Sequence, residues 1–390
     1  MHPDLVSVLR CPVCGDALAL TARTANCPQR HAFDLAKQGY LNLLPSASTG
    51  IDGDSAEMVE ARDAFLAGGF YGPIREALVA ASLRALEEHD AEVVAEDGAE
   101  DGAGGAEDGA GGAVQGAGGV EDGAGGAEDG AGGAEDGAGG AVHGAGGVED
   151  GAGGAVRGAE AGGMGDAQHA LENRGKHDAE GGAQDDPADD SGHQAGTTAA
   201  GLVVEVGAGT GYYLAGVVAA RARLWGLGLD VSRYAARRAA RVDPERIGAV
   251  VCDAWRELPV QDAAARVVLN VFAPRNATEM ARILAPGGVL LVVTPNQAHL
   301  AELIAVLGLV KVDEEKERRL SESLSGSFER TGSESVEVAM RLDHAAVERL
   351  VAMTPSARHT AKDELAGRIA VLADPVEVTL SVTLSTWRTV

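Results

Sequence analysis

The sequence predicts an α/β fold around a mostly parallel sheet, preceded by a small metal-binding segment and interrupted by a long segment that does not fold. Three observations carry this prediction. Short β-rich apolar runs alternate with helical stretches over residues 201–390, three of the four cysteines lie within the first 27 residues, and Gly, Ala, Asp and Glu dominate residues 91–200. Alternation of this kind is typical of parallel strands joined by helices.

The net charge of −27 does not describe the folded part of the chain. Residues 90–200 contain 25 acidic and three basic side chains, so they contribute −22 of the net charge of −27. The remainder is unremarkable for a soluble enzyme, and the acidic balance does not argue against an RNA partner. No secretory signal opens the chain, and no apolar run approaches the roughly 20 residues of a membrane helix. We therefore expect a cytoplasmic protein with no membrane segment.

The chain divides into four predicted parts: a zinc-binding segment (1–45), a helical linker (46–90), a disordered insertion (91–200) and a catalytic domain (201–390). In the linker, apolar residues recur at helical spacing over residues 53–90. Glycines at 68–69 and the pair Gly72-Pro73 predict a break into two helices. Either Asp54 or Ser55 is suited to cap the first of them.

The insertion repeats a seven-residue unit, as in AEDGAGG and VEDGAGG. A period of seven suggests a coiled coil, but each unit has three glycines and no large apolar residue for a seam. Ordering such a chain costs entropy that no apolar burial offsets, so we expect disorder. A functional alternative is an acidic tail that mimics RNA or contacts a partner.

The catalytic part shows five apolar runs separated by helical stretches. The predicted strands are Leu202–Val206, Leu224–Leu229, Ile247–Cys252, Val267–Val271 and Val289–Val293, and the predicted helices are 211–222, 232–241, 276–284 and 297–307. Val376–Leu384 also has β character and is expected to supply antiparallel edge strands.

A metal-binding pattern opens the chain. Cys11, Cys14, Cys27 and His31 form C-x2-C-x12-C-x3-H. Two pairs of ligands on short loops complete a closed tetrahedral site, so we expect a structural Zn²⁺ that supplies much of this segment's folding free energy. The alternative is ordinary core cysteines beside a surface histidine. Cys252 is expected to be a buried core thiol, and His299 and His344 are expected at the surface.

A glycine loop follows the first strand of the catalytic part. Glu205 precedes Gly207, Gly209 and Gly211 in a G-x-G-x-G pattern. Glycines permit positive φ and let the backbone approach a ligand closely. The pattern differs from the G-x-G-x-x-G motif of dinucleotide-binding proteins, and the loop contains no basic residue that could bind a phosphate.

Further polar residues stand at the ends of the next strands. Asp230 is placed to bind the hydroxyls of a ribose, Asp253 to face an adenine amino group, and the stretch 270–274 ends the fourth strand. With Pro286-Gly287-Gly288, the set is similar to the S-adenosylmethionine site of class I methyltransferases. The alternative is a Rossmann-type domain for another nucleotide. The candidate cofactor contacts are Glu205, Gly207, Gly209, Gly211, Tyr212, Tyr213, Asp230, Asp253 and Ala254.

Longer motifs resemble one family. The zinc segment, with CPQRHAFDLAKQGYLNLL at 27–44, closely resembles that of RlmA-type 23S rRNA (guanine-N1-)-methyltransferases. Further matches are GDSAEM at 53–58, VGAGTGYY at 206–213, GLDVS at 228–232, the pairs at 294–295 and 299–300, and MTP at 353–355. The zinc segment is the specific part, because many methyltransferases share the cofactor motifs. The resemblance covers the whole chain except the insertion. The sequence departs from the family pattern in three places. One is the insertion itself. The others are Asp253, where some members have a small polar residue, and Glu205, where Asp is commoner.

The resemblance implies an activity and its partners. It implies a class I methyltransferase domain with a mostly parallel seven-stranded sheet, S-adenosylmethionine as cofactor, a structural zinc, and a guanine in a 23S rRNA hairpin near the peptide exit tunnel as substrate. Some family members confer resistance to macrolides such as tylosin. A homodimer that forms an RNA cleft is compatible with the sequence, as is a single chain.

The chemistry asks for two further sets of residues. Guanine N1 loses a proton as it is methylated, so a base or a path to water is needed. Our candidates at the reacting centre are Asn270, Phe272 and Pro274; Phe272 either stacks on the base or belongs to the core. For RNA we expect Arg23, Arg30 and Lys37 toward phosphate, while Phe33 and Tyr40 either stack on bases or fill the small core.

Two other functions remain open at this point. One is a small-molecule or protein methyltransferase that carries a zinc domain, which methylation of protein-free rRNA would exclude. The other is a non-catalytic RNA-binding protein with a vestigial pocket, which cofactor binding would exclude.

Overall fold

The computed structural model describes residues 1–45, 53–101, 201–309, 316–354 and 362–390. Its strands are β1 (Ala19–Thr21), β2 (Thr24–Asn26), β3 (Ala32–Asp34), β4 (Leu41–Asn42), β5 (Leu202–Val206), β6 (Trp225–Asp230), β7 (Ile247–Val251), β8 (Ala265–Val271), β9 (Leu284–Pro295), β10 (Phe328–Leu342) and β11 (Val376–Thr389). The helices are α1 (Pro3–Ser7), α2 (Ala56–Ala67), α3 (Gly72–Asp101), α5 (Tyr212–Ala220), α6 (Arg233–Ala239), α7 (Ala277–Ile283), α8 (Ala301–Leu307), α9 (Lys316–Leu324), α10 (His344–Ala352) and α11 (Lys362–Ile369).

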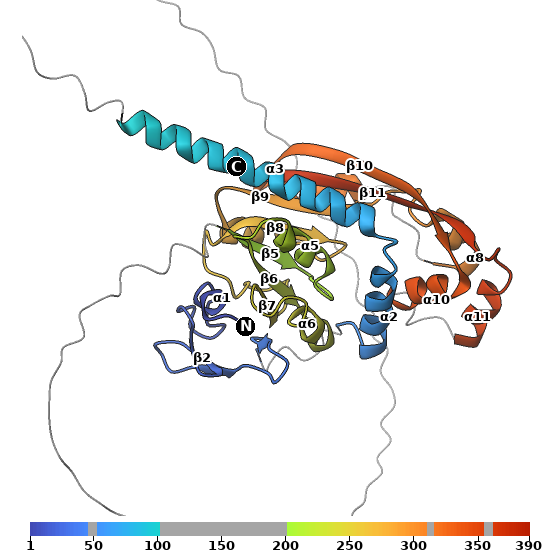
Figure 1. Cartoon of the computed structure of the whole chain (residues 1–390), viewed down its shortest axis with the longest axis horizontal. Coiled ribbons are helices and arrows are strands. Elements are labelled where there is room, and N and C mark those ends of the chain that lie inside the picture. The colour runs from blue at the N-terminus through green and yellow to red at the C-terminus, as the bar shows by residue number, and fades with distance from the viewer. Residues whose placement is uncertain (46–52, 102–200, 310–315, 355–361) are drawn as a thin grey trace, which may run out of the picture. The chain divides into compact units, whose positions relative to one another are not determined.

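One eight-stranded sheet organises the molecule, in the order β10-β11-β9-β8-β5-β6-β7-β4 (Figure 1). The pairs from β9 to β4 are parallel, and β11 runs antiparallel to both β9 and β10. Seven strands come from the catalytic part, as predicted. The eighth is β4, two residues of the zinc segment that pair with β7, so the zinc segment is part of the same sheet.

Successive residues of the central strands pack on opposite faces, as the two-residue period of a strand requires. Val203 lies in one apolar cluster with α2, α3, α5 and α10, whereas Val204 lies in another with α1 and α7. The same alternation runs along β8 and β9, where residues 267, 269, 289 and 291 face the first cluster and 268, 290 and 292 the second. In Figure 1, α3 crosses the sheet beside β9, β10 and β11.

The zinc segment shares the second cluster rather than building a core of its own. Leu5, Leu9 and Leu41 are fully buried there with residues of β6, β7 and the following loop. The backbone continues the contact: Leu41 and Asn42 pair with β7, and the amide of Leu43 donates to the carbonyl of Val251 at 2.9 Å. The segment is therefore docked on the catalytic sheet by both apolar burial and strand pairing.

The helical linker forms two helices with the predicted break. Ser55 is the cap, and its hydroxyl accepts a hydrogen bond from the amide of Met58 at 3.3 Å. The second helix, α3, runs to Asp101 and so extends into the first residues of the predicted insertion (91–200). Alanine and glutamate favour helix and let α3 continue past His89. Residues 102–200, where the predicted disorder and the seven-residue repeat lie, fall outside the described residues.

Two other predictions need correction at the far edge of the sheet. Val376–Leu384 does lie in an antiparallel strand, but β11 is the second strand from the edge, and β10 occupies the edge itself. The predicted helix 297–307 begins only at residue 301, because Leu300 adopts a left-handed conformation with φ +57°. No helix in the described parts of the chain is both long enough and apolar enough to span a bilayer.

Candidate cofactor and metal sites

Four side chains converge at the tip of the zinc segment. The ligand atoms of Cys11, Cys14, Cys27 and His31 all lie within 4.8 Å of one another, and none of the four cysteines forms a disulfide. His31 Nδ1 lies 3.5 Å from Cys11 Sγ and 3.3 Å from Cys27 Sγ, and Cys14 Sγ lies 3.6 Å from Cys27 Sγ. A tetrahedron around Zn²⁺ with bonds of about 2.0–2.3 Å has edges of about 3.5–3.7 Å. The set therefore fits a structural zinc with no open position.

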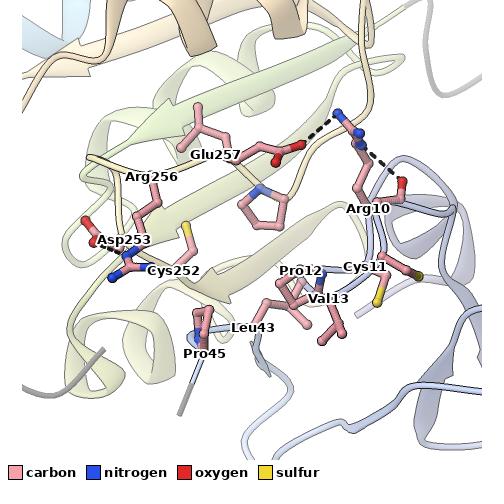
Figure 2. A pocket seen from close by; sticks show the side chains of 14 residues that line it. Arg10, Cys11, Pro12, Val13, Leu43, Pro45, Cys252, Asp253, Arg256 and Glu257 are labelled. Atoms are coloured by element: carbon pink, nitrogen blue, oxygen red, sulfur yellow. Dashed lines mark hydrogen bonds and ion pairs between the residues drawn. The ribbon is translucent and has the colours of Figure 1, made fainter. Parts of the chain in front are cut away.

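A groove lies between this metal site and the end of β7. It encloses about 640 Å³ and is lined by Pro12 and Val13 of the zinc segment, Leu43 after β4, and Cys252 with Arg256 beyond β7 (Figure 2). Val13 is 65% exposed. Cys252 is buried, as predicted for a core thiol, and burial raises its pKa.

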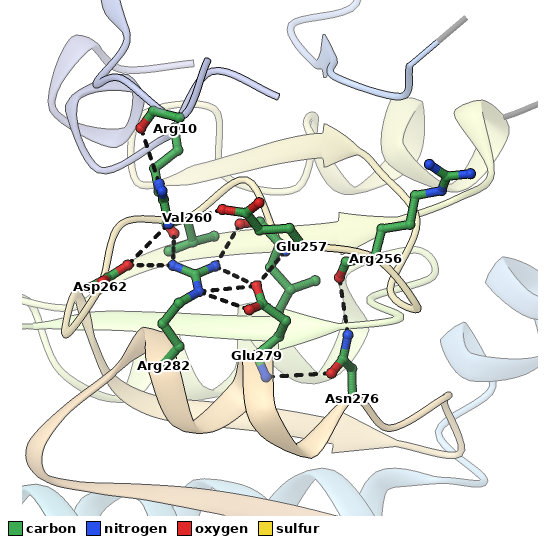
Figure 3. Close-up of polar contacts among 10 residues, drawn as sticks. Arg10, Arg256, Glu257, Val260, Asp262, Asn276, Glu279 and Arg282 are labelled. Carbon is green, nitrogen blue, oxygen red and sulfur yellow. Dashed lines mark hydrogen bonds and ion pairs between the residues drawn. The ribbon is translucent and has the colours of Figure 1, made fainter. Parts of the chain in front are cut away.

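Ion pairs hold in place the loop after β7, part of which lines this groove (Figure 3). The guanidinium of Arg282 donates to Asp262 at 2.7 Å, to Glu279 at 2.5 Å and to the carbonyls of Leu258 and Val260 at 2.8 Å. It holds the pKa of Asp262 below its usual value. Arg10 of the zinc segment joins the network through Asp262 at 3.2 Å and Glu257 at 3.1 Å. The loop after β7 is thus bonded both to α7, through Arg282, and to the zinc segment, through Arg10.

A second cavity, the cofactor crevice, opens at the carboxyl ends of the parallel strands. It encloses about 220 Å³, and its lining includes Gly207, Gly209, Asp230, Asp253 and Ala254 from the predicted set. Cys252 and Asp253 line the groove as well, so the two cavities are neighbours.

The glycine loop at the crevice has the backbone that the sequence predicts. Gly207, Gly209 and Gly211 all have positive φ, between +53° and +79°. A Cβ on Gly207 would lie 2.4 Å from the Cβ of Ala273, so a side chain does not fit there. Because these glycines carry no side chains, other groups can approach the loop backbone closely.

Two acidic residues line the crevice at the ends of β6 and β7. The Asp230 carboxylate accepts from the amides of Gly209 and Ser232, both at 2.8 Å, and its pKa is raised by burial. Asp253 is 6% exposed, accepts from the amide of Trp255 at 2.9 Å and pairs with Arg256 at 3.3 Å. Both carboxylates keep lone pairs for further donors such as hydroxyl or amino groups.

The remaining predicted cofactor contacts lie deeper. Glu205 is 1% exposed and accepts from the amide of Leu214 at 3.1 Å, and burial raises its pKa to about 8. It lines a smaller cavity of about 40 Å³ together with Tyr212 and Tyr213. Tyr213 is buried, whereas the Tyr212 ring is covered by the guanidinium of Arg75 at 4.7 Å from its centroid.

The three candidate catalytic residues at the end of β8 differ in burial and in whether they line the crevice. Asn270 is fully buried, and its amide donates to the Pro274 carbonyl at 2.8 Å, while its Oδ1 has no partner among the described residues. Phe272 is 41% exposed with φ +52°, and its ring contacts Tyr71 and His299 at centroid distances of 6.2 and 5.9 Å. Phe272 and Pro274 line the cofactor crevice, and Asn270 shapes the turn that carries them.

His299 is buried, contrary to the surface position expected. Its Nε2 lies 3.3 Å from the Tyr71 hydroxyl, and its Nδ1 accepts from the amide of Ser381 at 3.3 Å. The sequence offered no sign of these partners, which lie 228 and 82 residues away. His344 is half-buried and lies 3.1 Å from the carbonyl of Leu372.

Among the expected RNA contacts, three side chains have partners within the chain. Arg23 donates to the carbonyls of Leu35 and Ala36 at 3.1 and 2.8 Å. Phe33 and Tyr40 are half-buried and pack against apolar clusters, which favours the core interpretation. Lys37 and Arg30 are exposed.

Among the crevice residues that sequence reasoning missed, three have charged or aromatic side chains. Arg62 and Asp54 reach it from α2 and the turn before it, and Trp255 lies on the loop after Asp253 with 65% of its surface exposed. Trp255 carried a usable signal, because it follows two residues after a predicted strand-end acid. Arg62 carried none, because only the tertiary fold brings α2 over the glycine loop.

Strand order, glycine loop and strand-end acids together define a class I methyltransferase. Residues 9–48 match the family model of the N-terminal zinc ribbon of RlmA. A putative 23S rRNA (guanine-N(1)-)-methyltransferase of Micromonospora griseorubida is 37% identical over 392 residues, covering 100% of this chain and 99% of the relative. The 23S rRNA (guanine(748)-N(1))-methyltransferase of Streptomyces fradiae is 36% identical over 388 residues, with coverage of 100% and 99%. The chain belongs to the RlmA-type 23S rRNA (guanine-N1-)-methyltransferase family.

Proposed function

We propose that this chain transfers a methyl group from S-adenosylmethionine to N1 of a guanine in 23S rRNA. The observation that carries the proposal is the full-length similarity to two relatives with that printed activity, in a chain that has both a four-ligand metal site and a cofactor crevice. The resemblance of the sequence motifs extends the proposal to a hairpin near the peptide exit tunnel and to a role in macrolide resistance.

In this proposal, the strand-end residues divide the cofactor between them. Asp253 and Ala254 face the adenine, Asp230 binds the ribose hydroxyls, and the backbone of the glycine loop faces the methionine portion. The bound cofactor supplies a methyl group on a sulfonium centre. Arg62 lines the crevice, and its buried Nε has no partner among the described residues, so it offers a donor to such a ligand.

The open side of the crevice is the proposed entrance for the guanine. Trp255 and Phe272 line it, and both are more exposed than large aromatic side chains usually are. A flipped base stacks on such rings for about 1–3 kcal/mol each. Asn270 is proposed as a positioning residue, because its amide holds the Pro274 carbonyl.

The groove beside the crevice is the proposed path of the RNA. It begins at the zinc segment and shares Cys252 and Asp253 with the crevice. RNA seated there would contact the zinc segment while presenting one base to the cofactor. A homodimer that encloses the hairpin belongs to the same proposal and predicts the mass of two chains in solution.

The direct test incubates the purified full chain with labelled S-adenosylmethionine and protein-free 23S rRNA, then digests the RNA to nucleosides. The proposal predicts label in 1-methylguanosine. Label in another nucleoside would move the reaction to a different atom. Cofactor binding without any label in RNA would favour a small-molecule or protein substrate.

A further inference from the structure

An ion pair from the helical linker stands at the cofactor crevice. Arg62, in the middle of α2, pairs with Asp54 at 2.5 Å, in the turn before that helix. Both residues line the crevice beside the glycine loop. The side chains are 29% and 26% exposed, so the pair is neither fully solvated nor sealed in the core.

The linker holds this pair firmly against the catalytic domain. The hydroxyl of Ser232 donates to the Asp54 carbonyl at 2.7 Å, and Arg62 donates to the Met353 carbonyl at 3.1 Å. A Cβ built on Gly209 would lie 3.4 Å from Cδ of Arg62, so the arginine stem lies directly on the glycine loop. The position of the guanidinium is therefore fixed by three separate parts of the chain.

One donor of this guanidinium is unused. Arg62 Nε is buried and has no hydrogen-bond partner among the described residues, although the Nη2 group makes two bonds. Buried donors nearly always find an acceptor, and a carboxylate is the acceptor whose geometry matches the edge of a guanidinium. The unused Nε–H is thus a place for an anionic oxygen.

Arg62 also lies between the cofactor crevice and the smaller cavity of about 40 Å³ at Glu205. It lines the larger crevice with Asp230 and Asp253 and the smaller cavity with Glu205 and Tyr213. If adenine and ribose occupy the Asp253 and Asp230 positions, the amino-acid end of the cofactor reaches the glycine loop beneath Arg62. That end carries one carboxylate and one ammonium group, opposite in sign to Arg62 and Asp54 respectively.

We infer that Arg62 and Asp54 form the subsite for the amino-acid end of the cofactor, with Arg62 binding the carboxylate and Asp54 facing the ammonium group. The inference rests on the proposed use of S-adenosylmethionine. The pair binds and orients the cofactor and takes no part in the transfer of the methyl group. It also explains why the helical linker is packed over the crevice.

The test measures binding of two ligands by calorimetry to the full chain without RNA. S-adenosylmethionine is compared with decarboxylated S-adenosylmethionine, which lacks only the carboxylate and keeps the amine. The wild type should prefer the complete cofactor by about tenfold to a hundredfold, the range of one charge-assisted contact. Arg62→Gln should reduce this preference to about threefold or less, and Asp54→Asn should weaken both ligands.

Arg238→Gln is the matched control. Arg238 of α6 pairs with Asp63 and so also tethers α2, but it does not line the crevice. This variant should keep the wild-type preference. The inference is overturned if Arg62→Gln keeps that preference, or if it loses both ligands equally, which would make Arg62 a structural clamp. It is also overturned if the wild type binds both ligands alike, a result that leaves the proposed function standing. A wild type that binds neither ligand would overturn the proposed function together with the inference.

Discussion

The zinc segment and the catalytic sheet are stabilised in different ways, although they share one apolar cluster. Strands β1 to β4 have two or three residues each, whereas β5 to β11 have between five and 15. Strands this short bury little surface between themselves, so the zinc segment depends on its metal and on docking against β7. The central catalytic strands, such as β5, β7 and β8, are buried on both faces and need neither.

Because of this difference, substitutions in the metal site and in the crevice should have different effects. Damage to the metal site should unfold the zinc segment and leave the sheet, whereas damage to the crevice should leave the zinc segment and remove cofactor binding. Cys252 and Asp253 lie where the groove at the zinc segment meets the cofactor crevice, since both residues line both cavities. The predictions below test how far the regions are independent.

The largest effect is expected from loss of a metal ligand. Cys27→Ser should reduce bound zinc, measured by mass spectrometry of metals, from one per chain to nearly none. Structural zinc supplies roughly 10 kcal/mol or more to small domains, so rRNA methylation should fall by more than about a hundredfold. S-adenosylmethionine should still bind, within about tenfold of the wild type.

Cys252→Ser is the control for this variant, because Cys252 is a buried thiol outside the metal cluster. It should keep the zinc. A Cys27→Ser protein that retains a full equivalent of zinc would contradict the four-ligand site.

The next effect concerns the crevice alone. Asp230→Asn should weaken S-adenosylmethionine binding by roughly tenfold to a hundredfold, because a charged acceptor for the ribose hydroxyls is worth about 1.5–3 kcal/mol. Zinc content should not change. Asp343→Asn, which alters a helix-capping carboxylate of α10 instead, should bind the cofactor as the wild type does. Equal affinities for the Asp230 and Asp343 variants would remove Asp230 from the site.

Substitution of the two aromatic residues should affect the RNA without affecting the cofactor. Trp255→Ala and Phe272→Ala should each raise the KM for rRNA by about fivefold to a hundredfold, from the loss of stacking worth about 1–3 kcal/mol. Calorimetry should give unchanged cofactor affinity. Val371→Ala, at a 76% exposed position, serves as a control. If both aromatic variants turn over rRNA normally, the base enters elsewhere.

The last effect is a pH dependence of stability. Burial raises the pKa of Glu205 to about 8, so the folded chain keeps a proton that the unfolded chain releases near pH 4.3. The free energy of unfolding should therefore fall as pH rises from about 5 toward 8, by on the order of 1 kcal/mol per pH unit from this group. Glu205→Gln should remove that slope and keep the bond from Leu214, as denaturant titrations without cofactor would show. Parallel slopes in both proteins would contradict the buried acid.

The elements found from the sequence are those whose signal is local. Five parallel strands are continuous apolar runs, and the glycine loop and the metal ligands are short motifs. Strand β10 was not predicted from the sequence, because one side of it is exposed and rich in Glu and Ser. Such a surface is expected of an edge strand that avoids pairing with other chains. Strand β4 has only two residues, and its pairing is visible only once β7 is in place.

The crevice shows the same division between local and tertiary information. Asp230 follows a predicted strand and was found, whereas Arg62 reaches the glycine loop from a helix about 150 residues earlier in the chain. His299 was misplaced because its partners, Tyr71 and Ser381, come from opposite ends of the sequence. Helical periodicity placed α2 correctly but says nothing of which element it covers.

The most direct test of the account is reverse transcription of 23S rRNA after treatment with the protein and S-adenosylmethionine. N1-methylguanine cannot form a Watson–Crick pair, so the polymerase halts beside it. The account predicts a single new stop at one guanine of the tunnel-proximal hairpin, absent when the Asp230→Asn protein is used at limiting cofactor. Stops scattered over the RNA, or no stop despite bound cofactor and zinc, would contradict it.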